Sequence, residues 1–298
     1  MNPLTKAILL VSLGLLWATR LSAIKSAGLS GIPVHVVVGV SIIGIAILFT
    51  AVALMRGNWP SLSKATTIFY ILSGVFGFIF PFTLEILVAP HLPVFVLIVI
   101  IATMPIVTLA ISAVVGHEAL SKNAVSAVLL GFIGALFLIW DTVQPSQTGR
   151  ADMIWIAIAL GVPVLYAANT VFVATKWPVA ADAIQVAHAQ ALIFSLAVLA
   201  GGLTMGGLSI WIEASLNPPA MALIILCEGG ALMLYLKIAR DHGAIYVSFA
   251  NYISMFFAAI IGACTFGDQL TWFSALAAAA IIGSVVLFQG KADWLIRR

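Results

Sequence analysis

Residues 34–55 read VHVVVGVSIIGIAILFTAVALM and contain no Asp, Glu, Lys or Arg. A hydrocarbon core of about 30 Å needs on the order of 20 apolar residues in one helix. A run of this length therefore predicts a transmembrane helix. Strands of a membrane barrel are excluded, because they would be about ten residues of strict polar and apolar alternation.

Similar stretches follow one another along almost the whole chain. Of its 298 residues, 63% are hydrophobic and 8% are charged, and this charge is far too low for a water-facing surface. The connections leave no room for a soluble catalytic or nucleic-acid-binding domain. We expect ten transmembrane helices, which span Leu4–Ala27, Val34–Met55, Thr66–Val88, Leu92–Val115, Ala124–Trp140, Met153–Thr175, Ala183–Met205, Ala220–Ala239, Ala244–Phe266 and Trp272–Phe288.

The positive charges indicate the orientation of these spans. With both termini placed in the cytoplasm, ten of the 13 Lys and Arg residues fall inside, Lys25 and Arg150 fall outside, and Arg20 lies in the membrane. Cytoplasmic loops carry such an excess of positive charge. We therefore expect a multi-pass protein of a bacterial inner membrane, and the pI near 9.0 does not indicate nucleic-acid binding.

The polar segment Asp141–Asp152 divides the chain into two halves, 1–145 and 146–298, with five predicted spans each. An odd number of spans turns the second half upside down relative to the first. An inverted repeat has two nearly equivalent conformations and binds substrate near the midplane, as secondary transporters do. Two short matches share one offset of about 150 residues: Leu16–Arg20 with Leu165–Asn169, and Gly116–Leu120 with Phe266–Leu270.

Motifs in both halves resemble those of a known family. In the first half they are Trp17-Ala18 followed by Lys25, and Met104-Pro105 followed by Glu118 and Leu120; in the second they are Met255 and Gly267-Asp268-x-Leu270. These residues resemble EamA-type members of the drug/metabolite transporter superfamily. The resemblance implies ten helices in five plus five and favours export. The chain departs from the family pattern at Met255, Asp268 and Arg20, so the resemblance carries over no substrate.

Arg20, Glu85 and Glu228 are the charged residues expected deep within the spans. A charge at the bilayer centre costs about 3 kcal/mol on insertion scales, so it persists where it is paired or lines a cavity. Arg20 lies one turn after Trp17, and together they could bind a carboxylate and stack a ring. The alternative is a structural ion pair between Arg20 and either Glu85 or Glu228.

The two glutamates have different settings. Glu85 follows Pro81 by four residues, which places it either at a hinge beside a cavity or at the outer interface. Glu228 lies well inside span eight, with Tyr235 two turns later on the same face. Glu228 could bind an ammonium group, carry a coupling proton or pair with Arg20.

Other polar residues complete the expected site. Tyr166 and Asn169 occupy the repeat positions of Trp17 and Arg20. The predicted substrate-binding set is Trp17, Arg20, Glu85, Tyr166, Asn169, His188, Glu228, Tyr235, Asn251 and Tyr252, of which Glu228, Glu85 and His188 are candidates for proton coupling. We expect no metal site, no organic cofactor and no catalytic group, because neither a nucleophile–base pair nor a metal-ligand motif occurs.

The sequence thus predicts a secondary transporter that works by alternating access. The expected cargo is a small polar metabolite, amino-acid-like or zwitterionic, and the expected direction is export. An importer or facilitator of an organic anion is the first alternative, with Arg20 as its uncompensated charge. A non-transporting membrane scaffold is the second. The expected partners are the lipid bilayer and the small-molecule substrate, while monomer and homodimer both stay open.

Overall fold

A computed structural model describes residues 3–81, 84, 88, 100–116, 121–142, 153–179, 181–205, 209–266 and 272–295. All regular structure in these ranges is helical. Within them, six helical stretches are long and apolar enough to cross a membrane, and three shorter apolar helices accompany them. The prediction of an all-helical, multi-pass membrane fold is confirmed, whereas the count of ten spans stays a prediction.

Several helices cover the predicted spans from end to end. α10, at Ala183–Met205, has the predicted bounds. α2 (Val34–Arg56) begins after Pro33 and ends before Gly57. Gly57 has a φ of 63°, a left-handed conformation that favours glycine at the end of a helix. The other long helices are α1 (Pro3–Leu29), α7 (Lys122–Thr142), α12 (Pro218–His242) and α15 (Trp272–Leu295).

Three predicted spans are interrupted. Span six forms α8 (Met153–Ala159) and α9 (Gly161–Thr175), because Pro163 has no N–H to donate to the carbonyl of Ala159. Span three forms α3 (Lys64–Gly74) and then the π-helix η1 (Val75–Ile79), shortly before Pro81. Span nine forms α13 (Ala244–Ser248) and α14 (Ala250–Phe266). Of span four, the structure describes Ile100 onward, including α6 (Met104–Val115).

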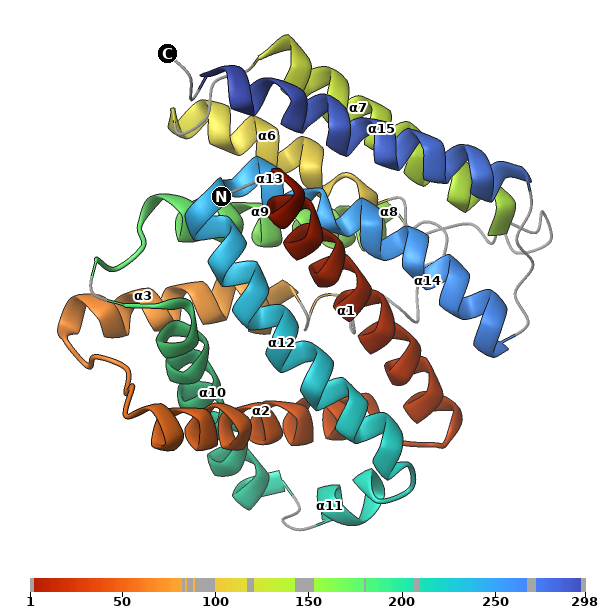
Figure 1. Ribbon diagram of the computed structural model, residues 1–298. Coiled ribbons are helices and arrows are strands. Elements are labelled where there is room, and N and C mark those ends of the chain that lie inside the picture. The colour runs from red at the N-terminus through yellow and green to blue at the C-terminus, as the bar shows by residue number, and fades with distance from the viewer. Residues whose placement is uncertain are drawn as a thin grey trace. The chain divides into compact units, whose positions relative to one another are not determined.

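The chain forms two compact units. Unit 1 comprises Met1–Leu15, Val75–Thr175 and Ile238–Arg298. In this unit α7 and α15 lie side by side along their length (Figure 1). Their close approach depends on Gly134, where an added Cβ would lie 3.0 Å from a side-chain carbon of Ile281. α6 packs against α9 and α13.

Unit 2 comprises Leu16–Gly74 and Lys176–Lys237. In this unit α10 packs against α2 and α3, and the short helix α11 (Ser209–Ala214) packs against α2. A buried apolar cluster that includes Ala27, Val36 and Met221 joins α1, α2 and α12. Unit 2 therefore contains the parts of α1, α10 and α12 on which half of the ten predicted site residues lie.

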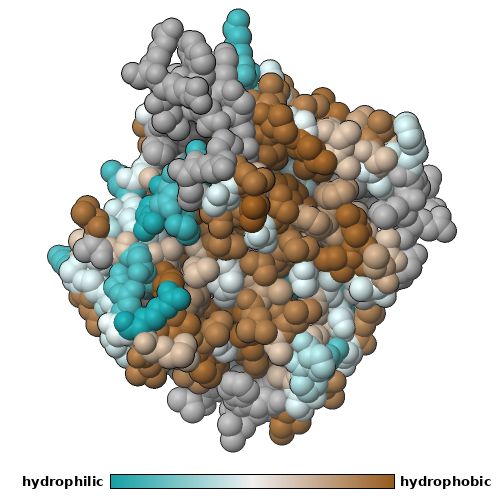
Figure 2. Space-filling model, in the orientation of Figure 1, coloured by the Kyte–Doolittle hydropathy of each residue, from teal (hydrophilic) through white to brown (hydrophobic). Residues whose placement is uncertain are grey.

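Large apolar side chains remain on the outside of the helices. Val114 is 88% exposed and Leu54 is 67% exposed. Brown, hydrophobic side chains cover much of the face drawn in Figure 2, and hydrophilic side chains gather in separate patches. Such an extent of exposed apolar surface is expected of helices that face lipid.

Candidate functional site

In unit 2, the C-terminal part of α1 and the N-terminal part of α12 form an antiparallel pair that holds the two described in-membrane charges. The Nε atom of Arg20 lies 3.0 Å from the Oε2 atom of Glu228. The side chains are 17% and 14% exposed. The ion-pair interpretation of Arg20 is thus confirmed with Glu228 as the partner, whereas Glu85 lies outside the described residues.

The ion pair lies well inside both helices. At 1.5 Å per residue, Arg20 is about 14 Å from the end of α1, and Glu228 is about 15 Å from the start of α12. Half of a hydrocarbon core of about 30 Å is the same distance. An unpaired charge this far from a helix end would be costly in a membrane.

A pair of aromatic rings lies next to the ion pair. The ring centroids of Trp17 and Tyr235 are 6.3 Å apart, and the ring planes are inclined by 42°. Trp17 precedes Arg20 by three residues, and Tyr235 follows Glu228 by seven, so each aromatic residue shares a helix face with its charged neighbour. Both rings are half-buried, and the site combines two opposite charges with an apolar wall.

Two glycines bring α12 close to its neighbours. An added Cβ at Gly229 would lie 3.0 Å from a methyl carbon of Leu48 on α2, and one at Gly230 would lie 3.3 Å from a methyl carbon of Leu16 on α1. Small residues allow such close approach between helices in membranes. The glycines thus hold Glu228 against α1, within reach of Arg20.

The outer end of the α1–α12 pair is fixed by Asn217. Its Oδ1 atom accepts a hydrogen bond from the backbone N–H of Ala220 at 3.2 Å, and its Nδ2 atom donates to the hydroxyl of Ser30 at 2.9 Å. Asn217 therefore caps α12 and ties it to the end of α1. This tie sets the register that places Glu228 opposite Arg20.

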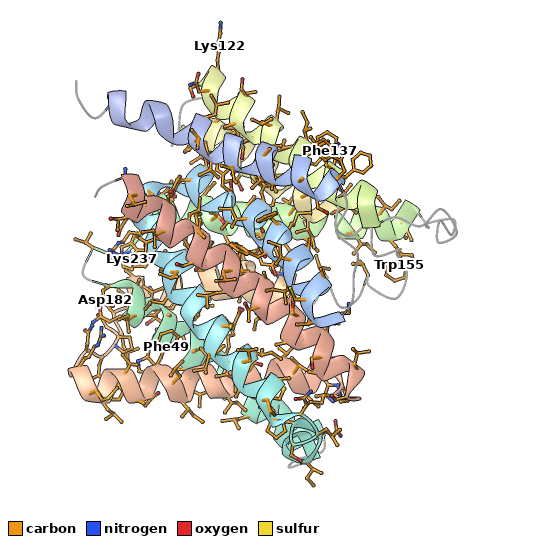
Figure 3. All side chains as sticks on the ribbon, turned by 45° about the vertical axis from the view of Figure 1, so that its right-hand side comes forward. Phe49, Lys122, Phe137, Trp155, Asp182 and Lys237 are labelled. Atoms are coloured by element: carbon orange, nitrogen blue, oxygen red, sulfur yellow. The ribbon has the colours of Figure 1, made fainter. Side chains whose placement is uncertain are left out.

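A second polar cluster in unit 2 surrounds the start of α10, which Asp182 marks in Figure 3. The Nδ2 atom of Asn58 donates to Asp182 Oδ2 at 2.6 Å, and the Nε2 atom of Gln185 donates to Asn58 Oδ1 at 2.6 Å. Gln185 Nε2 also donates to the carbonyl of Trp59 at 2.9 Å. We call Asn58, Asp182 and Gln185 the clasp, because they fasten the α2–α3 connection to α10.

His188 lies beside the clasp and is fully buried. Its Nε2 atom is 3.0 Å from the hydroxyl oxygen of Thr50 on α2. The Trp59 ring lies against the imidazole, with centroids 5.6 Å apart and planes inclined by 44°. Trp59 is itself 50% exposed, so its indole stands between His188 and the outside of the unit.

The remaining predicted site residues belong to unit 1. Asn169 is buried in α9, where an added Cβ on Gly77 would collide with its amide, and Tyr166 lies half-buried one turn earlier. The Nδ2 atom of Asn251 donates to the Ser248 carbonyl at 3.0 Å and to the Met104 sulfur at 3.1 Å. A substrate-binding role for these three residues stays a prediction.

Tyr252 packs inside unit 1. The residue is fully buried, and its hydroxyl donates to the carbonyl of Val128 at 3.1 Å. An added Cβ on Gly131 would collide with its ring. These contacts use both the ring and the hydroxyl, which favours a structural role over the predicted contact with substrate.

Sequence reasoning missed Thr50, Asn58 and Asp182. A local signal existed for Asp182, because Asp-x-x-Gln before an apolar run is a capping box. The structure forms it: the N–H of Gln185 donates to Asp182 Oδ1 at 2.8 Å, and the N–H of Asp182 donates to Gln185 Oε1 at 3.0 Å. Within the described residues, no group of three or more His, Cys, Asp and Glu is placed to hold a metal ion.

The sequence model of the EamA-like transporter family matches residues 4–140. These residues are a little less than half of the chain, and over them the chain is similar to the EamA-like transporter family. This family indicates a membrane transporter of the drug/metabolite transporter superfamily, and its members are transporters rather than enzymes. The resemblance read from the Trp17 and Met104-Pro105 motifs is therefore confirmed.

Comparison with curated proteins gives no match for this chain. Among solved structures, 29 chains match. One of them, a crystal structure of a protein that is 17% identical in sequence, covers 98% of each chain with a TM-score of 0.74. At this identity the likeness shows a shared fold, and it carries no information on substrate.

Proposed function

We propose that this protein is a secondary transporter that exports a small zwitterionic metabolite, such as an amino acid, across a bacterial inner membrane by alternating access. The similarity of residues 4–140 to a transporter family supports transport, and the Arg20–Glu228 ion pair inside α1 and α12 carries the assignment of the substrate class. The guanidinium would bind the carboxylate of the substrate, and the Glu228 carboxylate would bind its ammonium group.

The exchange of one ion pair for two explains why a zwitterion suits this site. In a low-dielectric setting, a charge that loses its partner is strongly destabilised. A zwitterion that inserts between Arg20 and Glu228 supplies a partner of opposite sign to each of them. Total charge stays balanced during the exchange, and the neighbouring Trp17 and Tyr235 rings would enclose the apolar part of the substrate.

The organic-anion alternative receives less support from the site. It depends on Arg20 being uncompensated, whereas the Nε atom of Arg20 lies 3.0 Å from Glu228. An anion bound to Arg20 would leave the Glu228 carboxylate as an excess negative charge inside the membrane. The scaffold alternative is disfavoured by the family, whose members transport.

The packing of the helices supports the proposed inverted repeat of halves 1–145 and 146–298. Helices related by the offset between the halves pack against each other within the units: α2 against α10, and α7 against α15. Each unit thus draws helices from both halves. Contacts between equivalent elements are expected around a two-fold relation, which is the basis of alternating access in such transporters.

Binding to the purified protein tests the proposed substrate class. A ligand that binds the folded state raises the unfolding temperature. We expect amino acids to raise it, and the matched amines and carboxylic acids, each with one charge removed, to raise it much less. Stabilisation by the carboxylic acid alone would favour the organic-anion alternative.

Transport by protein in liposomes tests the mechanism. We expect the wild type to exchange labelled amino acid for unlabelled amino acid across the bilayer, and Arg20→Gln and Glu228→Gln to lose this exchange. Arg240→Gln is a matched control, since Arg240 forms an ion pair with Asp241 near the end of α12, away from the site. Equal exchange by all three variants and the wild type would contradict the proposed role of the pair.

A further inference from the structure

The fully buried His188 has one ring nitrogen with a hydrogen-bond partner and one without. Its Nε2 atom lies 3.0 Å from the hydroxyl oxygen of Thr50, whereas Nδ1 has no hydrogen-bond partner among the described residues. A buried polar atom without a partner is unfavourable, because it has given up its hydrogen bonds to water. Such an atom in a native site calls for an explanation.

The hydrogen bonds of Thr50 determine which ring nitrogen carries the hydrogen. The Thr50 hydroxyl donates to the carbonyl of Ala46 at 2.7 Å. A hydroxyl has a single hydrogen to donate, so towards His188 the Thr50 oxygen accepts. Nε2 of His188 is therefore the N–H nitrogen, and Nδ1 presents a bare lone pair.

We propose that Nδ1 of His188 is a proton-binding site covered by Trp59. An imidazole lone pair is the side-chain acceptor that binds a proton in the physiological range. Proton binding leaves the Thr50 contact intact, because Nε2 remains a donor in both forms. The role of this proton, coupling to solute movement, rests on the proposed transport function; its binding does not.

One neighbour would stabilise the imidazolium. The Trp59 ring centroid lies 5.6 Å from that of His188, which is within the range of a cation–π interaction. This contact favours a positive charge on the ring.

The other titratable groups of the elements around His188 leave the imidazole as the group to titrate. α2 and α3 pack against α10. Their charged or titratable side chains are His35, Arg56, Lys64 and Tyr70. The first three are exposed, Tyr70 is a buried phenol near Asp182, and Asp182 itself is occupied by Asn58 and Gln185.

The exposed half of Trp59 gives the site an entrance. The α2–α3 connection covers His188 with this one indole, and the connection is held to α10 by the clasp. A displacement of the indole would expose Nδ1 without breaking α2 or α10. The geometry thus combines a bare acceptor and an aromatic cover in a single unit.

Nitrogen NMR of the ¹⁵N-histidine-labelled protein in lipid nanodiscs tests the proton site directly. At about pH 8 we expect hydrogen on Nε2 and none on Nδ1 of His188, and hydrogen on both at about pH 5. The His188→Gln variant assigns the signal, with His35→Gln as the control that leaves it unchanged. Hydrogen on Nδ1 at about pH 8, or none at about pH 5 in the folded protein, would overturn the proposal.

Variants that keep His188 provide a second test if His188→Gln does not fold. Thr50→Val removes the acceptor and should allow the hydrogen onto Nδ1 at high pH, whereas Thr50→Ser should preserve the wild-type tautomer. Trp59→Leu should lower the midpoint of the titration by about half a pH unit through loss of the cation–π contact. An unchanged tautomer in Thr50→Val, or an unchanged midpoint in Trp59→Leu, would overturn the assigned geometry.

The transport assay separates proton binding from coupling. We expect amino-acid exchange that responds to a pH gradient in the wild type and in His35→Gln, and loss of that response in His188→Gln. If Nδ1 titrates but no solute moves, the proposed transport function fails and the proton site stands. If His188→Gln still responds to the gradient, the coupling role of the proton is overturned.

Discussion

The Nε atom of Arg20 lies 3.0 Å from the Oε2 atom of Glu228, and this ion pair joins α1 to α12 in unit 2, well inside both helices. Each residue compensates a charge that would otherwise be expensive in the membrane. The pair also links a stability requirement to a functional one, because a zwitterionic substrate can replace each partner. Its energetics can therefore be measured with and without ligand.

Removal of one partner should destabilise the protein more than removal of both. Arg20→Gln leaves Glu228 without a partner, and we expect the free energy of unfolding to fall by about 3 kcal/mol. The same fall is expected for Glu228→Gln. The double variant, Arg20→Gln with Glu228→Gln, should recover most of the loss, because two neutral amides need no compensation. Denaturant unfolding of the purified protein measures all four free energies.

The Arg240–Asp241 pair provides the control for this cycle. Its side chains are 30% and 26% exposed, and exposed ion pairs contribute about 0–1 kcal/mol. Arg240→Gln should therefore change the free energy of unfolding by less than either single variant of the buried pair. Additive losses in the double variant would show that Arg20 and Glu228 do not interact energetically.

The clasp should control the stability of the α2–α3 connection. Asp182→Ala removes the cap of α10 and the acceptor for Asn58, and we expect a loss of about 1–2 kcal/mol. Amide hydrogens of residues 57–63 and of the first turn of α10 should then exchange faster with solvent. Ser30→Ala, which removes an exposed hydrogen bond to Asn217 elsewhere in the unit, should leave their exchange rates unchanged.

Glycine in α7 makes room for the ring of Tyr252. An alanine Cβ at Gly131 would collide with that ring, so Gly131→Ala should lower the free energy of unfolding by about 1–3 kcal/mol. Gly28→Ala is the matched control, because an added Cβ there meets no atom within 4 Å. Thermal unfolding compares the two variants, and an equal effect would show that Tyr252 is not tightly packed.

The positions of the long helices could be predicted from the sequence, because the thickness of the bilayer sets their length. α10 has the predicted bounds. The break between α8 and α9 was not predicted, although the missing N–H of Pro163 is a local reason for it. The short helix α11 was not predicted. It lies in the connection between two long helices. Its six residues are too few to show the apolar repeat of a helix in the sequence.

A site contact could be predicted where its physical cause is visible in the nearby sequence, and not where the partner lies far away in the chain. A charge inside a membrane requires a partner, so an ion pair for Arg20 could be expected, although the sequence left Glu85 and Glu228 open. The partner of His188 could not be expected, because Thr50 is 138 residues away in the chain and carries no local mark. The capping box at Asp182 was a local signal and could have been read.

The rings of Trp17 and Tyr235 should determine the preference for the apolar part of the substrate. Their centroids are 6.3 Å apart beside the ion pair. Trp17→Ala removes one wall, and we expect affinity for amino acids with large apolar side chains to fall by about 1 kcal/mol, or roughly fivefold. Affinity for glycine should change little, because glycine has no side chain to contact the ring.

A ligand series measured by thermal shift checks this prediction. Trp17→Phe is the matched variant, since it keeps an aromatic ring opposite Tyr235 and should retain most of the preference. A uniform loss of affinity for every amino acid, glycine included, would place Trp17 in support of the Arg20–Glu228 geometry instead. A preference that stays unchanged in Trp17→Ala would mean that the apolar part of the substrate is bound elsewhere.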